Sequence, residues 1–255
     1  MTQEEVPLQG GNVGAGVVRV GATVRRPAGP SSRAVEALLV HLENVGFEGC
    51  PRFLGYDGQG RQVLSYVEGH AGPAPSDIDR PGLVEVGRLV RGYHDAAERF
   101  VPPPGAVWDV PVRPDREELV CHHDLAPWNL VRGAGGLVFI DWDGAGPGSW
   151  RWDLAWACLG FVPLAPWGEL EDDEAAGRLS ALVDGYGLDG PSRLALVEVL
   201  AERALSMYRL LHRGHLSGEE PWAGLYQRGH GELWSGAARY AGGRYGLWRE
   251  ALGVA

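Results

Sequence analysis

The spacing of apolar residues changes near residue 69 of this 255-residue chain. Before that point, apolar positions come in short runs with polar neighbours, a pattern that favours β-strands. One longer run, at residues 32–44, repeats its leucines and valines at helical spacing and predicts an amphipathic helix. The predicted strands lie at residues 17–20, 23–26 and 62–67. The first part of the chain is therefore predicted to be a small, sheet-rich unit.

Longer patterns of helical period dominate the rest of the chain. The clearest predict helices at residues 83–100 and 191–213, where apolar residues recur on one face. Glycine and proline are frequent in residues 69–77, as in a connector between two units. The sequence thus predicts an α+β protein with two lobes. A small β-rich lobe spans residues 1–68, and a larger, mainly helical lobe spans residues 69–255.

A candidate hairpin in the second lobe carries most of the chemical information. Two apolar, β-favouring runs flank the turn-forming sequence Gly-Ala-Gly-Gly at residues 133–136. If Leu130 faces Ile140, the next pair outward is Asn129 and Asp141, with Cβ atoms about 5 Å apart. An amide oxygen and a carboxylate at that separation suit Mg²⁺, which completes its shell with phosphate oxygens and water. Asn129 and Asp141 are therefore the predicted metal ligands.

Asp124 lies five residues before Asn129, in a loop that also contains Pro127. From there its carboxylate can lie beside the metal without binding it. Phosphoryl transfer needs a general base at such a place, because the base accepts the proton of the attacking hydroxyl while the metal neutralises charge on the phosphate. Asp124 is the predicted catalytic base.

This segment resembles a motif of aminoglycoside and choline-type phosphotransferases. His122, Asp124 and Asn129 match the pattern HxDxxxxN, and Asp141 matches the family's downstream Asp. That family has the protein-kinase-like fold, so the resemblance implies a bilobal kinase that phosphorylates a hydroxyl of a small molecule. It also implies Mg²⁺ as cofactor, ATP as phosphate donor with GTP left open, and a bracing role for His122. One departure is His123, where the family commonly has glycine.

Outside residues 119–157 the resemblance rests on weaker motifs. The glycine-rich residues 8–27 resemble the family's first β-hairpin, which closes over the ATP phosphates. The segment that precedes the connector resembles the strip of backbone that holds adenine. The nucleotide contacts that follow from these two likenesses are Gly10, Gly11 and Asn12 for the phosphates, and Tyr66 and Val67 for the adenine.

All 23 basic residues are arginines, so the phosphate-binding lysine of the family must have a replacement. Arg25 is the predicted replacement, with Arg26 as the alternative, because adjacent strand residues face opposite sides and only one can reach the phosphates. Arginine keeps the charge and can bind phosphate oxygens through two nitrogen atoms. Its acidic partner on the following helix is predicted to be Glu36 or Glu43, although both also suit a plain surface position.

Charge and cysteine content narrow the class of protein. The net charge of −10 argues against a nucleic-acid binder, since no basic face is available to neutralise phosphates. No segment has the pattern of a signal peptide or a membrane span. The three cysteines are widely spaced and form no CxxC pair, which favours a reducing cytoplasm. The oligomeric state is left open.

The acidity is concentrated in the second lobe, which holds 17 arginines and 26 acidic residues. Acidic walls attract amines, so the hypothesis is a hydroxylated, cationic substrate such as an aminoglycoside. The candidate acidic contacts are Glu169, Glu171, Asp172, Asp173 and Glu174, although acids at a helix start more often form a solvated face. Candidates for ring stacking are Trp150, Trp152, Trp156 and Trp167, although core packing is the commoner fate of tryptophan.

Three functions are compatible with these patterns. The leading one is an ATP-dependent phosphotransferase with an alcohol acceptor. The second is a nucleotide-binding pseudokinase, which the missing lysine and the undecided helix Glu favour. The third is a metal-dependent hydrolase built on His122, His123 and Asp124, although no further ligand lies at a helical spacing such as HExxH.

Overall fold

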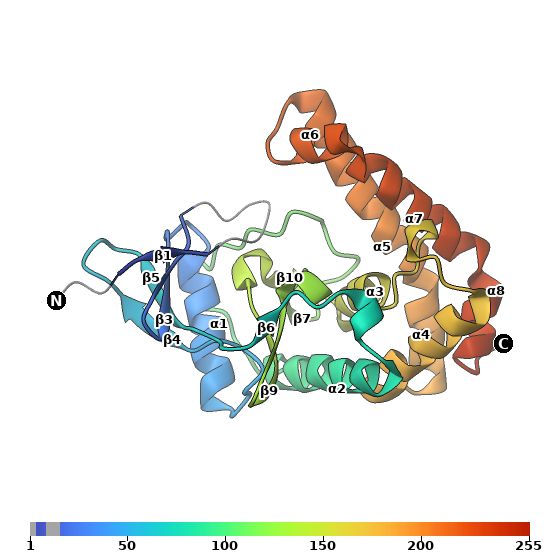
Figure 1. The fold of residues 1–255 in the computed structure, drawn as a ribbon, viewed down its shortest axis with the longest axis horizontal. Helices are drawn as coiled ribbons and strands as arrows, with labels where there is room; N and C mark the ends of the chain where they lie inside the picture. The colour runs from blue at the N-terminus through green and yellow to red at the C-terminus, as the bar shows by residue number, and fades with distance from the viewer. Residues whose placement is uncertain (1–3, 9–15) are drawn as a thin grey trace.

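A five-stranded antiparallel sheet forms the N-terminal lobe (Figure 1), with the strand order β1-β2-β3-β5-β4. The computed structural model describes residues 4–8 and 16–255. The strands are β1 (Val6–Pro7), β2 (Val18–Val20), β3 (Thr23–Arg26), β4 (Phe53–Tyr56) and β5 (Gln62–Ser65). The predicted strands are confirmed, although β5 ends two residues earlier than expected. Strand β3 lies between β2 and β5, so both of its edges are hydrogen-bonded.

Helix α1 (Ser32–Asn44) packs in the same lobe, and it confirms the helix predicted there. Its apolar stripe is buried: Leu38, Leu39 and Leu42 have no exposed surface. The stripe belongs to a core that continues into the larger lobe. The two lobes therefore share one hydrophobic interior.

The larger lobe is mainly helical and lies towards the other end of the long axis (Figure 1). Its helices are α2 (Arg80–Ala97), α3 (Trp150–Phe161), α4 (Asp172–Tyr186), α5 (Gly190–Ser217), α6 (Trp222–Leu225), α7 (Gly231–Gly243) and α8 (Tyr245–Ala251). Single helical turns occur at η1 (Pro75–Asp77), η2 (Pro127–Asn129), η3 (Trp142–Gly144), η4 (Pro166–Gly168) and η5 (Tyr226–His230). The predicted α+β organisation is confirmed, while the boundary at residue 68 stays a prediction.

The two long predicted helices are present with shifted ends. Helix α2 begins at Arg80 because the carboxylate of Asp79 accepts a hydrogen bond from the backbone nitrogen of Gly82, at 2.9 Å. Helix α5 begins in the same way at Gly190, because the carboxylate of the preceding Asp189 accepts a hydrogen bond from the backbone nitrogen of Ser192. Within residues 4–8 and 16–255, no helix combines the length and apolar character needed to cross a bilayer.

The larger lobe contains two small sheets, and one of them includes the predicted hairpin. The first pairs β7 (Leu119–Cys121) with β10 (Gly146–Gly148), and the second has the order β6 (His70–Ala71), β8 (Leu130–Gly133), β9 (Gly136–Phe139). The predicted hairpin is therefore confirmed as β8 and β9. The segment that carries His122, Asp124 and Asn129 lies between β7 and β8, and so connects one small sheet to the other.

The predicted register of this hairpin is wrong by one residue. Leu130 pairs with Phe139 rather than with Ile140, because the pair formed by Gly133 and Gly136 closes the hairpin around a two-residue turn. Asn129 consequently faces Ile140, whose backbone nitrogen donates to the Asn129 carbonyl at 2.8 Å. Asp141 lies beyond the strand pair, in the left-handed region at φ 62°.

Close approach of α2 and α4 depends on glycines. A Cβ atom at Gly87 of α2 would press on the carbonyl oxygen of Leu182 and lie 2.7 Å from the backbone nitrogen of Tyr186. Gly185 of α4 meets the carbonyl of Val84 in the same way. The helices can therefore pack backbone against backbone only where no side chain intervenes.

We expect Gly87→Ala to lower the free energy of unfolding by about 1–3 kcal/mol, since the added methyl group forces α2 and α4 apart. Gly92→Ala is the matched control on the same helix, because its Cβ would meet nothing closer than Phe47 at 3.7 Å. That control is expected to be neutral or stabilising by up to about 1 kcal/mol. Urea unfolding of both variants measures the difference, and equal losses would contradict this account of the helix pair.

Candidate active site

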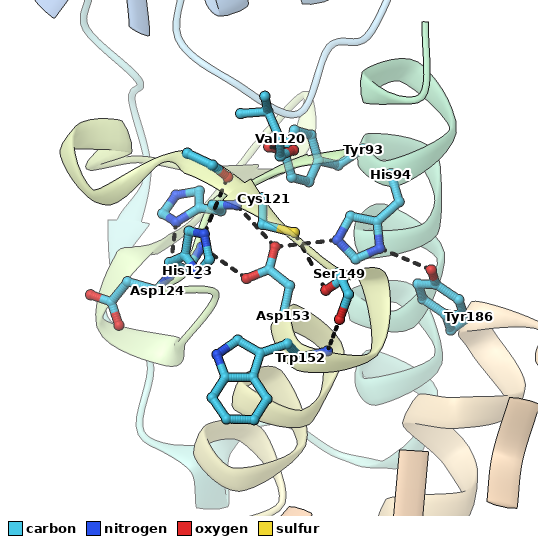
Figure 2. Close-up of polar contacts among 12 residues, drawn as sticks. Tyr93, His94, Val120, Cys121, His123, Asp124, Ser149, Trp152, Asp153 and Tyr186 are labelled. Atoms are coloured by element: carbon cyan, nitrogen blue, oxygen red, sulfur yellow. Dashed lines mark hydrogen bonds and ion pairs between the residues drawn. The ribbon is translucent and has the colours of Figure 1, made fainter. Parts of the chain in front are cut away.

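The loop that precedes β8 is held by one buried carboxylate. Asp153, in the first turn of α3, has no exposed surface. One of its oxygens accepts from the backbone nitrogen of His123 at 2.8 Å, and the other accepts from that of His122 at 2.9 Å. His94 of α2 adds a contact of 3.2 Å through Nε2. Figure 2 shows Asp153 between His94 and the loop, so that it ties α2, α3 and the loop together.

Asp153 stays ionised in spite of its position. Burial raises the pKa of the carboxyl group, but the hydrogen bond from His94 and the charges of the neighbouring histidines outweigh this effect and bring the pKa to about 2. The other nitrogen of His94 lies 2.9 Å from the hydroxyl of Tyr186. His94 therefore links the buried carboxylate of Asp153 to Tyr186 of α4.

Both histidines of the loop direct their rings at backbone carbonyls. Nε2 of His122 lies 3.1 Å from the Ile140 oxygen, and its ring packs on Trp142 with centroids 4.5 Å apart. Nε2 of His123 lies 3.1 Å from the Pro147 oxygen, and burial lowers the pKa of this histidine. Nδ1 of His122 accepts a hydrogen bond from the backbone nitrogen of Asp124 at 3.3 Å, so neither ring is hydrogen-bonded to the Asp124 carboxylate.

His94, Cys121 and Asp153 form the group of potential metal donors that lie close together in the described part of the chain. Its chemistry does not suit a metal. The Asp153 oxygens are taken by N–H donors, and burial raises the pKa of the Cys121 thiol well above its ordinary value. The thiol is directed at the Ser149 carbonyl instead. The group serves to hold the loop.

Asp124 directs its carboxylate away from this buried network (Figure 2). Three N–H groups donate to it. Oδ2 accepts from Nδ2 of Asn129 at 2.7 Å and from Nε1 of Trp128 at 3.0 Å, while Oδ1 accepts from Nε1 of Trp156 at 2.8 Å. The structure therefore brings the predicted base and one predicted metal ligand into direct contact. It also adds two tryptophans for which the sequence motif gives no signal as hydrogen-bond donors.

The other predicted metal ligand lies with a second acid and an arginine. The side chains of Asp141 and Asp143 are about half exposed, at 50% and 56%. Nη2 of Arg26 lies 3.5 Å from Oδ1 of Asp141 and also contacts Asp143. A cation thus already lies against these carboxylates. The Nδ2–H group of Asn129 donates a hydrogen bond to Asp124, so the amide oxygen of Asn129 is the atom that could bind a metal. Together with the carboxylate oxygens of Asp141 and Asp143, it is the kind of hard ligand that fits a divalent cation such as Mg²⁺.

The comparisons with known proteins agree with this geometry. The sequence profile of the phosphotransferase enzyme family matches residues 85–197, which include the loop and the hairpin. The trifolitoxin immunity protein of Rhizobium leguminosarum bv. trifolii is 34% identical over 220 residues, covering 77% of this chain and 79% of that protein. The chain belongs to the phosphotransferase enzyme family.

Solved structures of small-molecule kinases have the same fold as this chain. A choline/ethanolamine kinase family protein from Mesorhizobium loti superposes with a TM-score of 0.63 at 17% identity, over 98% of this chain and 92% of that chain. The amicoumacin kinase hAmiN in complex with AMP-PNP, Ca²⁺ and Ami superposes with a TM-score of 0.61 at 14% identity, over 75% of each chain. The bilobal kinase-like fold predicted from the sequence is confirmed.

In this phosphotransferase Arg26 rather than Arg25 contacts Asp141 and Asp143, while the choice of Arg25 as the phosphate-binding residue stays a prediction. Nε of Arg25 lies 3.7 Å from Asp57 instead. The two side chains leave β3 on opposite sides, as neighbours on a strand must, and only Arg26 lies on the side of Asp141. The sequence alone could not fix which side faces the hairpin, since that depends on how the two lobes pack.

Neither predicted acidic partner contacts Arg26 in the structure. Glu36 accepts a hydrogen bond from the hydroxyl of Tyr56 at 3.1 Å, and Glu43 lies 3.9 Å from Nε of Arg52. Burial lowers the pKa of Arg26, and the charge of Asp141 acts in the opposite direction. Asp141 and Asp143 therefore take the place that the helix Glu was expected to occupy.

The remaining predicted nucleotide contacts are only partly described. Gly10, Gly11 and Asn12 lie outside the described residues. Tyr66 follows β5 directly, donates its backbone nitrogen to the Ala22 carbonyl at 2.9 Å, and carries the guanidinium of Arg19 over its ring at 3.7 Å. Val67 is the next residue, in the segment that connects the lobes. Their role in binding adenine stays a prediction.

Two of the acidic residues at the start of α4 form ion pairs with arginines from other parts of the larger lobe. Asp172 lies 2.7 Å from Nε of Arg244, and Glu174 lies 2.6 Å from Nη2 of Arg80. Both acidic side chains are about half exposed in these pairs. The geometry therefore favours the solvated-face interpretation for these two residues.

Four tryptophans form a cluster beside Asp124: Trp128, Trp156, Trp167 and Trp234. Trp156 and Trp234 are stacked with centroids 4.6 Å apart, while Trp128 and Trp167 meet them edge-on. Trp128 and Trp167 are the exposed members, at 50% and 42%, and Trp156 is buried. The exposed members present aromatic surface close to the predicted base.

We expect Asp153→Asn to show that this buried carboxylate stabilises the protein in a pH-dependent way. Its pKa is about 2 in the folded protein and 3.8 ordinarily, so ionisation contributes about 2 kcal/mol above pH 4. This contribution is lost as the pH falls through 2. The wild type should therefore exceed the variant by its largest margin above pH 4, and the margin should narrow below pH 3.

Urea unfolding of both proteins over this pH range provides the measurement. Asp95→Asn, an exposed acid of α2 paired with Arg91, is the control and should change the free energy of unfolding by less than about 0.5 kcal/mol. A margin between wild type and Asp153→Asn that stays constant from pH 5 to pH 2 would contradict the assignment.

Proposed function

We propose that this protein is an ATP-dependent phosphotransferase that transfers the γ-phosphate to a hydroxyl group of a small molecule, with Asp124 as catalytic base. The observation that carries the proposal is the direct contact between Asp124 and Asn129, at 2.7 Å, on a loop fixed from behind by Asp153. Membership of the phosphotransferase family supports the reaction class. The carboxylate of Asp124 points away from the buried network (Figure 2), where an acceptor can reach it.

Asn129 and Asp141 are the residues proposed to hold Mg²⁺. When bound, such an ion neutralises charge on the phosphates and positions the transferred group. Asp124 accepts the proton of the attacking hydroxyl at a carboxylate oxygen. Arg26 binds phosphate oxygens through its guanidinium group, which its position next to Asp141 supports. Gly10, Gly11, Asn12, Tyr66 and Val67 remain the proposed nucleotide contacts.

The acceptor is proposed to be a hydroxylated antibiotic or toxin. The relative named as a trifolitoxin immunity protein supports a protective role, and the net negative charge of the second lobe supports a cationic acceptor. With Asp172 and Glu174 engaged by arginines, the exposed Trp128 and Trp167 are the better candidates for contact. The cytoplasm is the proposed compartment, since Cys50, Cys121 and Cys158 are buried free thiols.

A nucleotide-binding pseudokinase is the alternative that a specific observation favours. Arg26 is ion-paired with the proposed metal-site acids, and Glu36 is bonded to Tyr56 instead of to Arg26. Such an arrangement would bind a nucleotide without aligning it for transfer. The two functions differ in a measurable way, because only the enzyme transfers phosphate to an acceptor.

Asp124→Asn is expected to reduce turnover by about 10²- to 10⁴-fold, because the acceptor hydroxyl loses its base. Turnover is followed by ADP release with a panel of aminoglycosides, choline, ethanolamine and nucleosides. Thermal stabilisation by Mg²⁺ and AMP-PNP should survive the substitution, and Asp95→Asn should retain full turnover. Stabilisation by the nucleotide without turnover of any acceptor by the wild type would favour the pseudokinase.

Arg26→Ala is expected to weaken binding of ATP by about 10- to 100-fold while leaving adenosine binding unchanged, because a charged donor to phosphate is removed. Arg25→Ala is the matched control on the same strand, and its side chain faces Asp57. Calorimetric titration of both variants with ATP and with adenosine separates phosphate binding from adenine binding. A larger loss of ATP affinity in the Arg25 variant would restore the original assignment.

A further inference from the structure

The carboxylate of Asp124 is restrained from two sides. Asn129 and Trp128 hold Oδ2 from within the catalytic loop, and Trp156 holds Oδ1 from α3. A carboxylate has about four lone-pair sites, two on each oxygen. Both sites of Oδ2 are thus taken, whereas Oδ1 accepts a single hydrogen bond. Oδ1 is therefore the oxygen with room for a proton, and Trp156 is the residue that orients it.

Trp156 is itself fixed by two neighbours from the helices that follow. Its ring stacks on Trp234 of α7 with an interplanar angle of 22°, and the guanidinium carbon of Arg203 of α5 lies 4.1 Å from the ring centroid. Only 5% of Trp156 is exposed. An indole packed in this way has little freedom to turn, so its N–H group keeps a constant direction.

Arg203 also contacts the backbone next to Asp124. Its Nη2 donates to the carbonyl of His123, the residue before Asp124, at 3.1 Å. Burial lowers the pKa of Arg203 to about 10, and the charges of Asp153 and Asp124 act against this decrease. The side chain thus remains a buried cation at neutral pH. An apolar side chain of similar volume would pack there without the desolvation cost, so stability alone does not account for this arginine.

We propose that Trp156 and Arg203 are positioning residues of the phosphotransfer reaction. Trp156 directs Oδ1 of Asp124 through its indole N–H, and Arg203 fixes both the Trp156 ring and the backbone in front of Asp124. Neither residue takes part in proton transfer. The proposal rests on the proposed function of Asp124, and it assigns to α5 and α3 a task that the sequence motif places in the loop alone.

Trp156→Phe tests the proposal, because phenylalanine retains an aromatic ring for Arg203 and Trp234 but has no N–H. We expect kcat to fall about 10- to 100-fold with the acceptor that the ADP-release panel identifies, as for the loss of a hydrogen bond to a charged group. The KM for ATP should stay unchanged. Trp248→Phe is the matched control, since the buried Trp248 of α8 donates its N–H to the Ala241 carbonyl and not to a carboxylate. That variant should lose similar stability and keep its kcat.

A second measurement needs no acceptor. In ¹⁵N-labelled protein, Asp124→Asn should shift the indole N–H resonances of Trp128 and Trp156 and leave that of Trp248 in place. Arg203→Met should shift the Trp156 resonance, and Arg203→Lys should restore part of the shift and part of the kcat. The resonances decide whether the indoles hold Asp124 even if the proposed function fails. Unmoved Trp156 resonances in Asp124→Asn, or a wild-type kcat in Trp156→Phe, would overturn the proposal.

Discussion

The site depends on the carboxylate of Asp153, which is buried and accepts hydrogen bonds from two consecutive backbone nitrogens. Consecutive N–H groups can point to one carboxylate only if the chain turns sharply, and His123 makes this turn at φ 67°. This conformation favours glycine, which explains why glycine is common at this position in the phosphotransferase family. Here the hydrogen bonds to Asp153 stabilise the turn, so that a residue with a side chain can occupy this position. The ring of His123 packs against the carbonyls of β10.

Asp153 and Asp124 therefore differ in what they can do, because their surroundings differ. Asp153 is saturated by backbone and histidine donors inside the protein, and its pKa of about 2 keeps it ionised as a fixed support. Asp124 is held by side chains only, and its carboxylate points out of the core (Figure 2). A rigid support behind the loop and an oriented carboxylate in front of it suit the role of general base that is proposed for Asp124.

The sequence predicted those parts of the site that depend on local spacing. His122, Asp124 and Asn129 are close in the chain, and their motif indicated the loop and the fold correctly. The hairpin register failed because the position of a two-residue turn among four small residues decides which residues pair, and a shift of one residue changes the face. The sequence could not decide whether Arg25 or Arg26 lies next to Asp141, because that depends on the packing of one lobe on the other.

Long-range contacts to the loop had no sequence signal. Trp156 and Arg203 are separated from Asp124 by 32 and 79 residues. The spacing of apolar residues along α3 and α5 could indicate only that both positions are buried. The sequence accordingly indicates stacking surfaces or core for the tryptophans, whereas the indole N–H of Trp156 contacts the Asp124 carboxylate.

The pairing of Arg26 with Asp141 and Asp143 follows from the same electrostatics that a metal-nucleotide site requires. Two acids close together repel one another, and a cation between them lowers that energy. In the described structure this cation is a guanidinium on β3. Under the proposed function, Asp141 and Asp143 would hold a metal cation in place of the guanidinium, and Arg26 would bind phosphate oxygens in place of the carboxylates. An arginine suits this exchange because its planar group can bind either a carboxylate or a phosphate through two nitrogens.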